Sequence, residues 1–474
     1  MENVTVKSVL ECTKGTLLSG NADLVLKAVS TDSREVSDET LFVPIVGENK
    51  DAHAFVEKAL LAGAPAALTA RREIFEDFIK NNPGEEKTFI LVEDTTKAIQ
   101  EIGKMARLKL KLPAIGVTGS VGKTTTREMI SAALSAGMKV YKTEKNYNNW
   151  LGVPLTLCDM SDDYDIGVLE LGLNVRGELP LISSLTNIET AVITNIGVAH
   201  IEYYGTKDEI CKEKFTITKG FSEDNPREKM LFLCGNDPYL MKYKDLTGYP
   251  YTIYGTEENA QYRAENVRVE NGKYTFDFSR RGEFLFTVTL SVLGEHNVLN
   301  ACAALAVADR YNVDLLKARD RLQEFTGFKN RLQQFEKNGV LIIDDTYNAS
   351  PDSMKAGLKV LSDMQYKDGT GRRIAVLGDM FELGENAPVY HYEVGAAAKL
   401  FNVDEYLLVG ENAKELGRGI QDVLPEKRIT HFESKAALLD ALKSMLRPGD
   451  IVYVKASNGM KLREITEGLL KDGE

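Results

Sequence analysis

The residues around Lys123 are of the types that bind a polyphosphate. The segment 116–126 reads Gly-Val-Thr-Gly-Ser-Val-Gly-Lys-Thr-Thr-Thr, with a buried strand expected over 114–117 and a helix over 123–136. Backbone N–H groups of such a loop cradle phosphate oxygens at the helix N-terminus. Lys123 would add positive charge at the β- and γ-phosphates, and the Thr124 hydroxyl would bind Mg²⁺. The predicted nucleotide contacts in this loop are Gly119, Ser120, Val121, Gly122, Lys123, Thr124 and Thr125.

Two more polar residues stand where neighbouring buried strands are expected to end. Apolar runs over 166–171 and 191–195 are typical of strands covered on both faces. Glu170 lies at the end of the first run, and His200 follows the second. Parallel sheets bind ligands beyond the carboxyl ends of their strands, so both side chains are expected near the phosphate loop. Glu170 and Thr124 would then hold one Mg²⁺, whereas a histidine in this position is by itself more often structural.

The elements that must position these residues predict an α/β protein with three domains. Short strands and helices alternate before residue 93, and a strand, glycine-rich turn and helix begin at 114. A hairpin over 267–276, with an Asn271-Gly272 turn, indicates an antiparallel sheet inserted in the central domain. Apolar strands over 340–343, 374–377, 406–409 and 451–454, separated by helices, predict a Rossmann-like sheet without a dinucleotide motif. The predicted domains are 1–92, 93–328 and 329–474.

Composition excludes several other classes of protein. The 474 residues are 43% hydrophobic and 27% charged, which is typical of a folded chain of about three domains. A net charge of −12 disfavours nucleic acid as a partner. No apolar run is long enough for a membrane span, and no secretory leader is expected. The five cysteines form no C-x-x-C pair, so reduced thiols in a cytoplasmic protein are expected. A monomer is the expected state, although the sequence itself leaves the oligomeric state open.

An ordered set of motifs resembles the Mur ligase family. The loop T-G-S-V-G-K-T-T is similar to the phosphate loop of Mur ligases and folylpolyglutamate synthases, with Val117 where the common phosphate-loop pattern has its first glycine. The other matching segments, in order, are TEKNYNNWLGVP (143–154), LELG (169–172), NIGVAH (195–200), GEHNVLN (294–300), Arg331, DDTYNASP (344–351) and GDMFELG (378–384). Together they extend over nearly the whole chain.

The resemblance implies further roles for single residues. Asn297 and Asn300 would line the adenine site and Arg331 would reach the γ-phosphate. Asp345 would lie near the ribose, with Asp344 the less favoured choice. In the N-terminal domain, S-T-D-S-R (30–34) and D-A-H-A-F (51–55) resemble the segments that line the UDP-sugar site, with Ala52 in place of a glycine. The expected substrate contacts are Thr31, Asp32, Ser33, Arg34, Asp51, His53, Asn146, Asn148, Asn149, Tyr347 and Asn348.

The family also has a carbamylated lysine that serves as a metal ligand. Alignment on Gly205 and Ile210 makes this residue Lys214, with Lys212 as a near alternative, and Thr216 stands where the family usually has glutamate. An ammonium group has no lone pair for a metal, whereas a carbamate offers oxygen. The resemblance thus implies two Mg²⁺ ions, the second at His200, and assigns metal binding to Thr124, Glu170, His200 and Lys214. The catalytic set would be Lys123, Glu170, His200 and Lys214.

The pair Tyr347-Asn348 and the GDMFELG segment are similar to one branch of the family. That branch adds D-alanyl-D-alanine to UDP-N-acetylmuramoyl-tripeptide in peptidoglycan precursor synthesis, and so serves cell-wall biogenesis, cell shape and cell division. The resemblance implies an ATP-dependent, ADP-forming ligase that works through an acyl phosphate. The alternatives are a sibling Mur ligase or folylpolyglutamate synthase-like amide ligase, and a non-catalytic nucleotide-binding partner protein. The sequence leaves open whether the third peptide residue is lysine or diaminopimelate.

Two segments of the C-terminal domain resemble family motifs, and one of them departs from the family pattern. Lys455-Ala-Ser-Asn-Gly-Met resembles K-G-S-R-G-M, with Ala456 for glycine and Asn458 for arginine. If that arginine holds the acceptor's carboxylate, this contact is in question here. His391 lies in a segment similar to a family motif, but we expect it to be structural.

Overall fold

The computed structural model describes residues 1, 4–47, 50–270, 272–364 and 371–471. Its α/β sheets contain five, nine and six strands, and β1 (Val4–Thr5) pairs with β3 (Val25–Leu26) in a small antiparallel ladder. The chain forms two compact units. Unit 1 contains 1–118, 138–192 and 213–231, and unit 2 contains 119–137, 193–212 and 232–474. The α/β class predicted from the sequence is confirmed.

The N-terminal sheet of unit 1 is mixed. Strands β4 to β7 are parallel, and β2 is antiparallel to β7 at one edge. The strand order is β2 (Thr16–Ser19), β7 (Thr88–Leu91), β6 (Ala66–Thr69), β5 (Thr40–Phe42) and β4 (Ala28–Ser30). The helices around it are α1 (Val6–Thr13), α2 (Val56–Leu61), α3 (Arg72–Asn81) and α4 (Thr95–Lys109).

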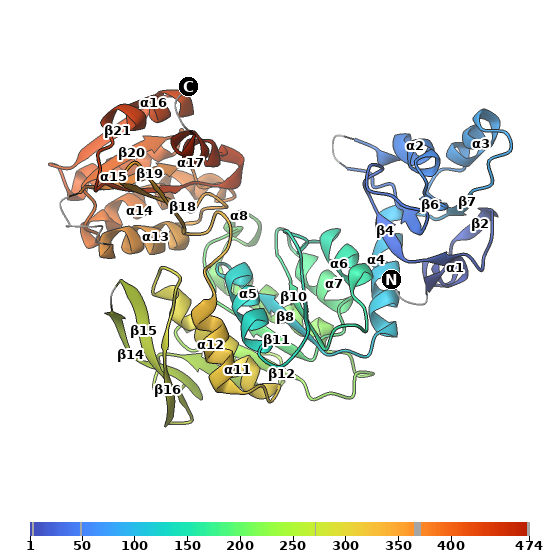
Figure 1. The fold of residues 1–474 in the computed structure, drawn as a ribbon, viewed down its shortest axis with the longest axis horizontal. Helices are drawn as coiled ribbons and strands as arrows, with labels where there is room; N and C mark the ends of the chain where they lie inside the picture. Colours follow the sequence, from blue (N-terminus) through green and yellow to red (C-terminus); the bar gives the residue numbers. More distant parts are fainter. Residues whose placement is uncertain (2–3, 48–49, 271, 365–370, 472–474) are drawn as a thin grey trace. The chain divides into compact units, whose positions relative to one another are not determined.

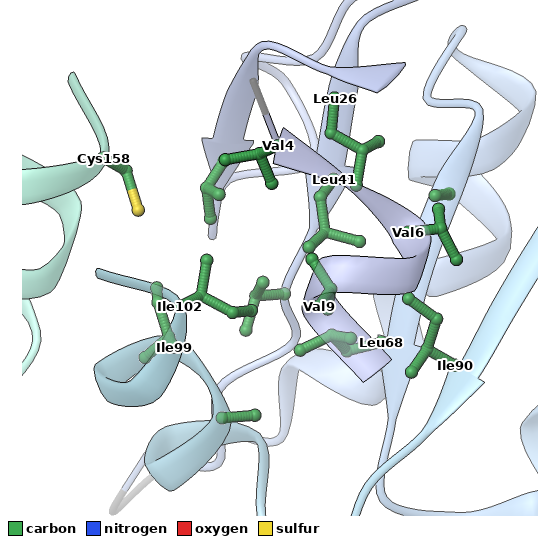
Figure 2. Packing of buried hydrophobic residues seen from close by; sticks show 14 of the residues in the cluster. Val4, Val6, Val9, Leu26, Leu41, Leu68, Ile90, Ile99, Ile102 and Cys158 are labelled. Carbon is green, nitrogen blue, oxygen red and sulfur yellow. The ribbon is translucent and has the colours of Figure 1, made fainter. Parts of the chain in front are cut away.

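Each face of this sheet has its own apolar core. On one face Phe42 and Phe89 pack with Val56 of α2 and Phe78 of α3. On the other face, shown in Figure 2, Val9 of α1 lies among strand residues and Ile99 and Ile102 of α4, with Cys158 of α6 (Gly152–Asp159) at the margin. Burial of such side chains typically contributes about 1.5–3 kcal/mol each. Helix α4 therefore ties the N-terminal sheet to the segment that carries α6.

Strands β8, β10 and β11 are short and fully buried. Strand β8 pairs in parallel with β10, which pairs in parallel with β9. In sheet order the strands are β9 (Val140–Lys142), β10 (Ile166–Glu170), β8 (Ala114–Thr118), β11 (Thr190–Ile193) and β12 (Met230–Cys234). The predicted buried strands are confirmed, although β11 ends two residues earlier than expected. Strand β10 ends at Glu170 itself.

In unit 2 the predicted hairpin is present, with Glu270 opposite Lys273; Asn271 of its turn lies outside the described residues. The antiparallel strands predicted for this part of the chain are present as β14, β15 and β16, and they continue the strand order of the nine-stranded sheet from β12 through a parallel β13–β14 pair. The strands are β13 (Tyr251–Gly255), β14 (Tyr262–Glu270), β15 (Lys273–Arg280) and β16 (Glu283–Thr289). Helices α5 (Lys123–Leu134), α11 (His296–Arg310) and α12 (Leu315–Glu324) pack on one another.

The C-terminal sheet has helices on both faces. Helices α13 (Pro351–Asp363) and α14 (Ala387–Ala396) lie on one face, with α15 (Ala413–Val423) packed on α14; α16 (Lys435–Met445) and α17 (Arg463–Leu470) lie on the other (Figure 1). The strand order is β17 (Gln333–Lys337), β18 (Val340–Asp344), β22 (Ile451–Lys455), β19 (Arg373–Gly378), β20 (Glu405–Val409) and β21 (Arg428–Phe432). All pairs are parallel except β17–β18. The four predicted strands are confirmed.

Among the described residues, none of the helices combines the length and the apolar character that crossing a membrane would require.

Candidate active site

The predicted phosphate loop lies between β8 and α5, as the sequence indicates. Gly119 has φ of 153°, and a Cβ at this position would lie 1.8 Å from Oγ1 of Thr194, so only glycine fits. Gly122 has φ of 81° and caps α5. Nζ of Lys123 donates to the carbonyls of Gly119, at 2.9 Å, and Ser120, at 3.3 Å. The lysine thus lies over the loop in which the phosphates are expected.

Asn195 braces this loop, a role that the sequence did not assign to it. The carbonyl of Asn195 accepts a hydrogen bond from the backbone N–H of Ser120. Its side-chain Oδ1 accepts from the backbone N–H of Val121 at 3.0 Å, and its Nδ2 donates to the carbonyl of Val121 at 2.9 Å. These two loop N–H groups are therefore engaged within the protein. The N–H groups of the first turn of α5 have no partners within the helix and point toward the phosphate position.

Arg331 reaches the same loop from the segment before β17. Its Nη2 donates to Oγ1 of Thr124 at 3.0 Å, and its guanidinium carbon lies 4.0 Å from the ring centroid of Tyr347. Nε of Arg331 is buried and has no hydrogen-bond partner among the described residues. A buried donor without a partner costs about 1–3 kcal/mol, so this group indicates a ligand with an acceptor oxygen.

The two predicted adenine-site asparagines are buried in a hydrogen-bonded chain. Asn297 donates to the carbonyl of Leu293, Asn300 donates to Asn297 at 2.8 Å, and Thr126 of α5 donates to Asn300 at 3.0 Å. This chain fixes α11 against the first turns of α5. In this structure the asparagines position the phosphate loop, and their contact with adenine stays a prediction.

The choice between the two adjacent aspartates is clear from their surroundings. Asp344 is buried and accepts hydrogen bonds from Thr346 and Thr466, so it is structural. Asp345 is partly exposed and is held by Lys455 at 2.6 Å and by Tyr453 at 2.9 Å. Asp345 is therefore the residue of the pair that a ribose could reach.

Glu170 is held in a defined orientation within unit 1. The carboxylate is 3% exposed, and its Oε1 accepts from Nδ2 of Asn148 at 2.8 Å. The backbone N–H of Glu170 donates to Oγ1 of Thr143. Asn149 caps the turn before α6 by accepting from Gly152 at 2.8 Å, while Asn146 is exposed. Asn148 and Asn149 thus hold protein atoms in place, and their substrate contacts stay predictions.

His200 and the two candidate lysines have very different surroundings. His200 has φ of 63°, a strained value for a residue with a side chain, and its Nδ1 lies 2.7 Å from Oε2 of Glu382. This contact lowers the pKa of Glu382. On α9 (Lys207–Phe215), Lys214 is 1% exposed, whereas the Lys212 side chain is 49% exposed and paired with Glu209. Only Lys214 has the burial expected of a metal-site residue.

The predicted UDP-site segments in unit 1 are a turn around Asp32 and the 3-10 helix η1 (Ala52–Phe55), which Asp51 caps. Hydrogen bonds from Arg34 hold the pKa of Asp32 well below its usual value, while Ser33 is buried and Thr31 half-buried. Nδ1 of His53 donates to Asp51 at 2.7 Å, and its Nε2 accepts from Ala70 N–H at 3.0 Å. Asp51 also pairs with Arg71. Both ring nitrogens of His53 are thus engaged within the protein, and its contact with substrate stays a prediction.

The described residues contain no cluster of three or more His, Cys, Asp or Glu side chains that could hold a metal unaided. Unit 2 contains the nucleotide loop, His200, Arg331, Asp345 and Tyr347. It also contains Asn348, whose side-chain oxygen accepts a hydrogen bond from the backbone N–H of Ala349. Glu170, Lys214 and the N-terminal turns belong to unit 1. The expectation that residues of both units meet in one site stays a prediction.

Comparison with known proteins decides the family. Family models match residues 25–107 (Mur ligase family, catalytic domain), 117–308 (Mur ligase middle domain) and 330–458 (Mur ligase, glutamate ligase domain). A Bacillus subtilis protein named UDP-N-acetylmuramoyl-tripeptide–D-alanyl-D-alanine ligase is 37% identical over 98% of both chains. The chain belongs to the Mur ligase family.

Solved structures of Mur ligases have the same architecture. MurF from Acinetobacter baumannii superposes with a TM-score of 0.87, at 28% identity and 99% coverage of both chains. MurF from Thermotoga maritima, solved in complex with ADP, has a TM-score of 0.79 at 26% identity, covering 94% of this chain and 98% of that one. The three-domain Mur ligase fold is therefore confirmed.

Proposed function

We propose that this Mur ligase joins D-alanyl-D-alanine to UDP-N-acetylmuramoyl-tripeptide, with ATP converted to ADP and phosphate, in peptidoglycan precursor synthesis. The supporting observation is the contact of Arg331 with Thr124 in the phosphate loop, which leaves a buried donor, Nε, for a phosphate oxygen. The match to the B. subtilis ligase of that name over 98% of both chains gives the reaction.

In the proposed mechanism the carboxylate of the tripeptide attacks the γ-phosphorus of ATP, and the bond to the ADP oxygen breaks. The dipeptide's amine, after losing a proton, attacks the carbonyl carbon of the acyl phosphate. A C–N bond forms and inorganic phosphate leaves. Lys123 and Arg331 face the transferred group with fixed positive charge, the kind of preorganised stabilisation that lowers the barrier of phosphoryl transfer.

Two Mg²⁺ ions are part of the proposal. Thr124 and Glu170 would hold one, and His200 and Lys214 the other, and the ions would neutralise charge on the phosphoryl group. The chemistry of these side chains fits: Glu170 is a buried carboxylate, the kind of ligand that Mg²⁺ prefers, and its Oε1 accepts a hydrogen bond from Asn148. Phosphate oxygens and water would complete each coordination sphere.

Lys214 is proposed to act as a carbamate. A buried ammonium is unfavourable, and reaction of the free amine with CO₂ forms an N–C bond, releases a proton and leaves an anionic oxygen donor. The burial of Lys214 supports this choice over the exposed Lys212.

The remaining predictions extend to the whole chain. We propose the domains 1–92 for the UDP-sugar, 93–328 for ATP and 329–474 for the ligase step, acting in a cytoplasmic monomer. The turns at Asp32–Arg34 and Asp51–His53 would contact the UDP-linked substrate.

The experiment is phosphate release by the purified protein with ATP, Mg²⁺ and UDP-N-acetylmuramoyl-tripeptide carrying lysine or diaminopimelate. The expected product, seen by mass spectrometry, is the pentapeptide, formed only when D-alanyl-D-alanine is present. Lys123→Ala serves as the negative control, with a loss of roughly 10²–10³-fold in rate. Ligation of a single amino acid instead of the dipeptide would point to a sibling ligase, and nucleotide binding without any ligation would refute the enzyme assignment.

A further inference from the structure

A cavity of about 320 Å³ lies in unit 2 beside His200. Val198 and Ile201, which flank His200 in the sequence, form part of its wall. The opposite wall comes from the start of α13, with Pro351, and from α14. The cavity thus borders the residue to which the second metal ion is assigned, although none of the proposed nucleotide or UDP contacts lines it.

The cavity contains charges of both signs. Lys207 and Lys355 contribute two cations, and Asp352 and Glu393 contribute two carboxylates. Among the described residues, Lys355, Asp352 and Glu393 form no ion pair. The Tyr390 hydroxyl also lines the cavity, and burial together with the nearby carboxylates raises its pKa. Charged groups of both signs that form no ion pair around one cavity fit a ligand that carries both charges.

The Asp352 carboxylate of α13 lies close to the phosphate loop. An ideal Cβ on Gly197 would lie 2.4 Å from Oδ2 of Asp352 and 3.2 Å from Cβ of Ser120. The Asp352 carboxylate therefore lies against Gly197, next to the phosphate loop, and Gly197 leaves the space for it. Lys355 follows one helical turn farther along α13. A ligand in the cavity would meet the carboxylate nearest the phosphates and the ammonium farther away.

We propose that this cavity binds the acceptor D-alanyl-D-alanine, with its ammonium at Asp352 and its carboxylate at Lys355; this rests on the proposed ligase function. Of the three substrates only the dipeptide is a zwitterion without net charge, matching the two cations and two carboxylates of the cavity. ATP and the UDP-linked peptide are polyanions. A dipeptide spans at most about 7 Å, comparable to the separation of groups one helical turn apart. This orientation points the reactive amine toward the phosphate loop.

The test measures KM for the dipeptide at saturating ATP and UDP-linked peptide, with D-alanyl-D-alanine and with its C-terminal amide. The wild-type protein should prefer the free acid. Lys355→Met should raise the KM for the free acid roughly 10- to 100-fold, the effect of losing one charge-assisted hydrogen bond, and should no longer distinguish acid from amide. Asp352→Asn should raise the KM for both ligands and keep their difference. KM for ATP should stay unchanged in both variants.

Lys359→Met is the matched control. Lys359 lies one turn beyond Lys355 on the same helix, pairs with Asp363 at 2.6 Å and does not line the cavity. The KM values of this variant for the dipeptide acid and amide should therefore equal those of the wild-type protein. If Lys355→Met keeps the wild-type KM for the dipeptide and still prefers the free acid over the amide, the cavity assignment is overturned while the ligase function stands. Absence of dipeptide ligation by the wild-type protein would instead refute the function itself. Binding of the dipeptide by saturation-transfer NMR, with ADP and UDP-linked peptide present, separates affinity from turnover.

Discussion

Arg331 is positioned by two neighbours with different chemistry. Thr124 accepts its hydrogen bond, and its guanidinium carbon lies over the ring of Tyr347, 4.0 Å from the ring centroid. Cation–π contacts of this kind contribute about 0.5–2 kcal/mol. Tyr347 was predicted to contact substrate, which stays a prediction, and its observed contact with Arg331 leads us to expect that it positions this arginine.

We expect Tyr347→Ala to raise the KM for ATP by roughly 2- to 30-fold, because Arg331 loses the surface that restrains it. Tyr347→Phe keeps the aromatic face and should behave like the wild type. Steady-state kinetics with each substrate varied in turn check this. A change confined to the KM for the UDP-linked peptide would show that Tyr347 contacts substrate instead.

Lys212 and Lys214 make a matched pair for testing the carbamate. Lys214→Ala should lose most activity, and a small carboxylic acid in the buffer should restore part of it by supplying the missing oxygen ligand. Lys212→Ala should be nearly silent, because Lys212 is exposed and its ion pair with Glu209 lies on the surface. Infrared or ¹³C NMR detection of a CO₂ adduct in the wild type and its absence in Lys214→Ala gives a readout independent of turnover. An inactive Lys212→Ala with an active Lys214→Ala would contradict the alignment.

At the scale of single residues, the motifs predicted which side chains gather around the phosphate loop but not which atoms they bind. Asn195 stood in a quoted motif at a strand end, yet nothing in its spacing showed that it would brace the loop backbone. The sequence likewise assigned no role in the site to Glu382 or Lys455. Their contacts with His200 and Asp345 depend on tertiary packing between segments far apart in sequence.

At the scale of elements, continuous apolar runs predicted the buried strands of both large sheets. Edge strands were harder to predict, because they have little apolar surface to cover. Strand β17 reads QQFEK and has alternating partly buried and exposed residues, and none of the residues of β21 is fully buried. The position of β13 to β16 in the sheet could not be predicted, because hydrogen bonding to β12 leaves no signal in local sequence.

His391 shows how one element is fixed in place. Its Nδ1–H donates to the carbonyl of Ala387 on α14 at 2.7 Å, and its Nε2 accepts from Met380 N–H at 2.9 Å, so the neutral ring links α14 to the segment after β19. The predicted structural role is confirmed.

Burial lowers the pKa of His391, so its protonation is favoured in the unfolded chain. The stability it contributes is complete above the unfolded pKa of about 6.5 and is lost as pH falls toward the folded value. We expect the wild-type melting temperature to fall between pH 7.5 and 5.5 more steeply than that of His391→Gln, which should be less stable at pH 7.5. Parallel pH dependence of the two proteins in thermal denaturation would count against this assignment.

At the scale of the whole molecule, the chain passes repeatedly between its two units. The phosphate loop and the segment 193–212 belong to unit 2, although the residues on either side of each belong to unit 1. The sequence predicted three α/β sheets and their order along the chain. It could not predict this interleaving, which arises from contacts between segments tens to hundreds of residues apart.

The order of chemical events follows from the proposed reaction. The γ-phosphoryl group has to be accepted by the carboxylate of the UDP-linked peptide, so phosphate release requires that peptide, and the dipeptide acts only afterwards.

We expect ATP with D-alanyl-D-alanine alone to release phosphate at a background rate. Addition of UDP-N-acetylmuramoyl-tripeptide should allow slow, continuing phosphate release, because water hydrolyses the acyl phosphate and regenerates the carboxylate, and the dipeptide should then raise the steady-state rate. Rapid-quench measurement of phosphate with each substrate omitted in turn checks this order. Arg34→Ala, at the exposed predicted UDP turn, should raise the KM for the UDP-linked peptide while the KM for ATP stays unchanged. Equal phosphate release with the dipeptide as the sole co-substrate would exclude the acyl-phosphate route, since no carboxylate of the tripeptide would then take part.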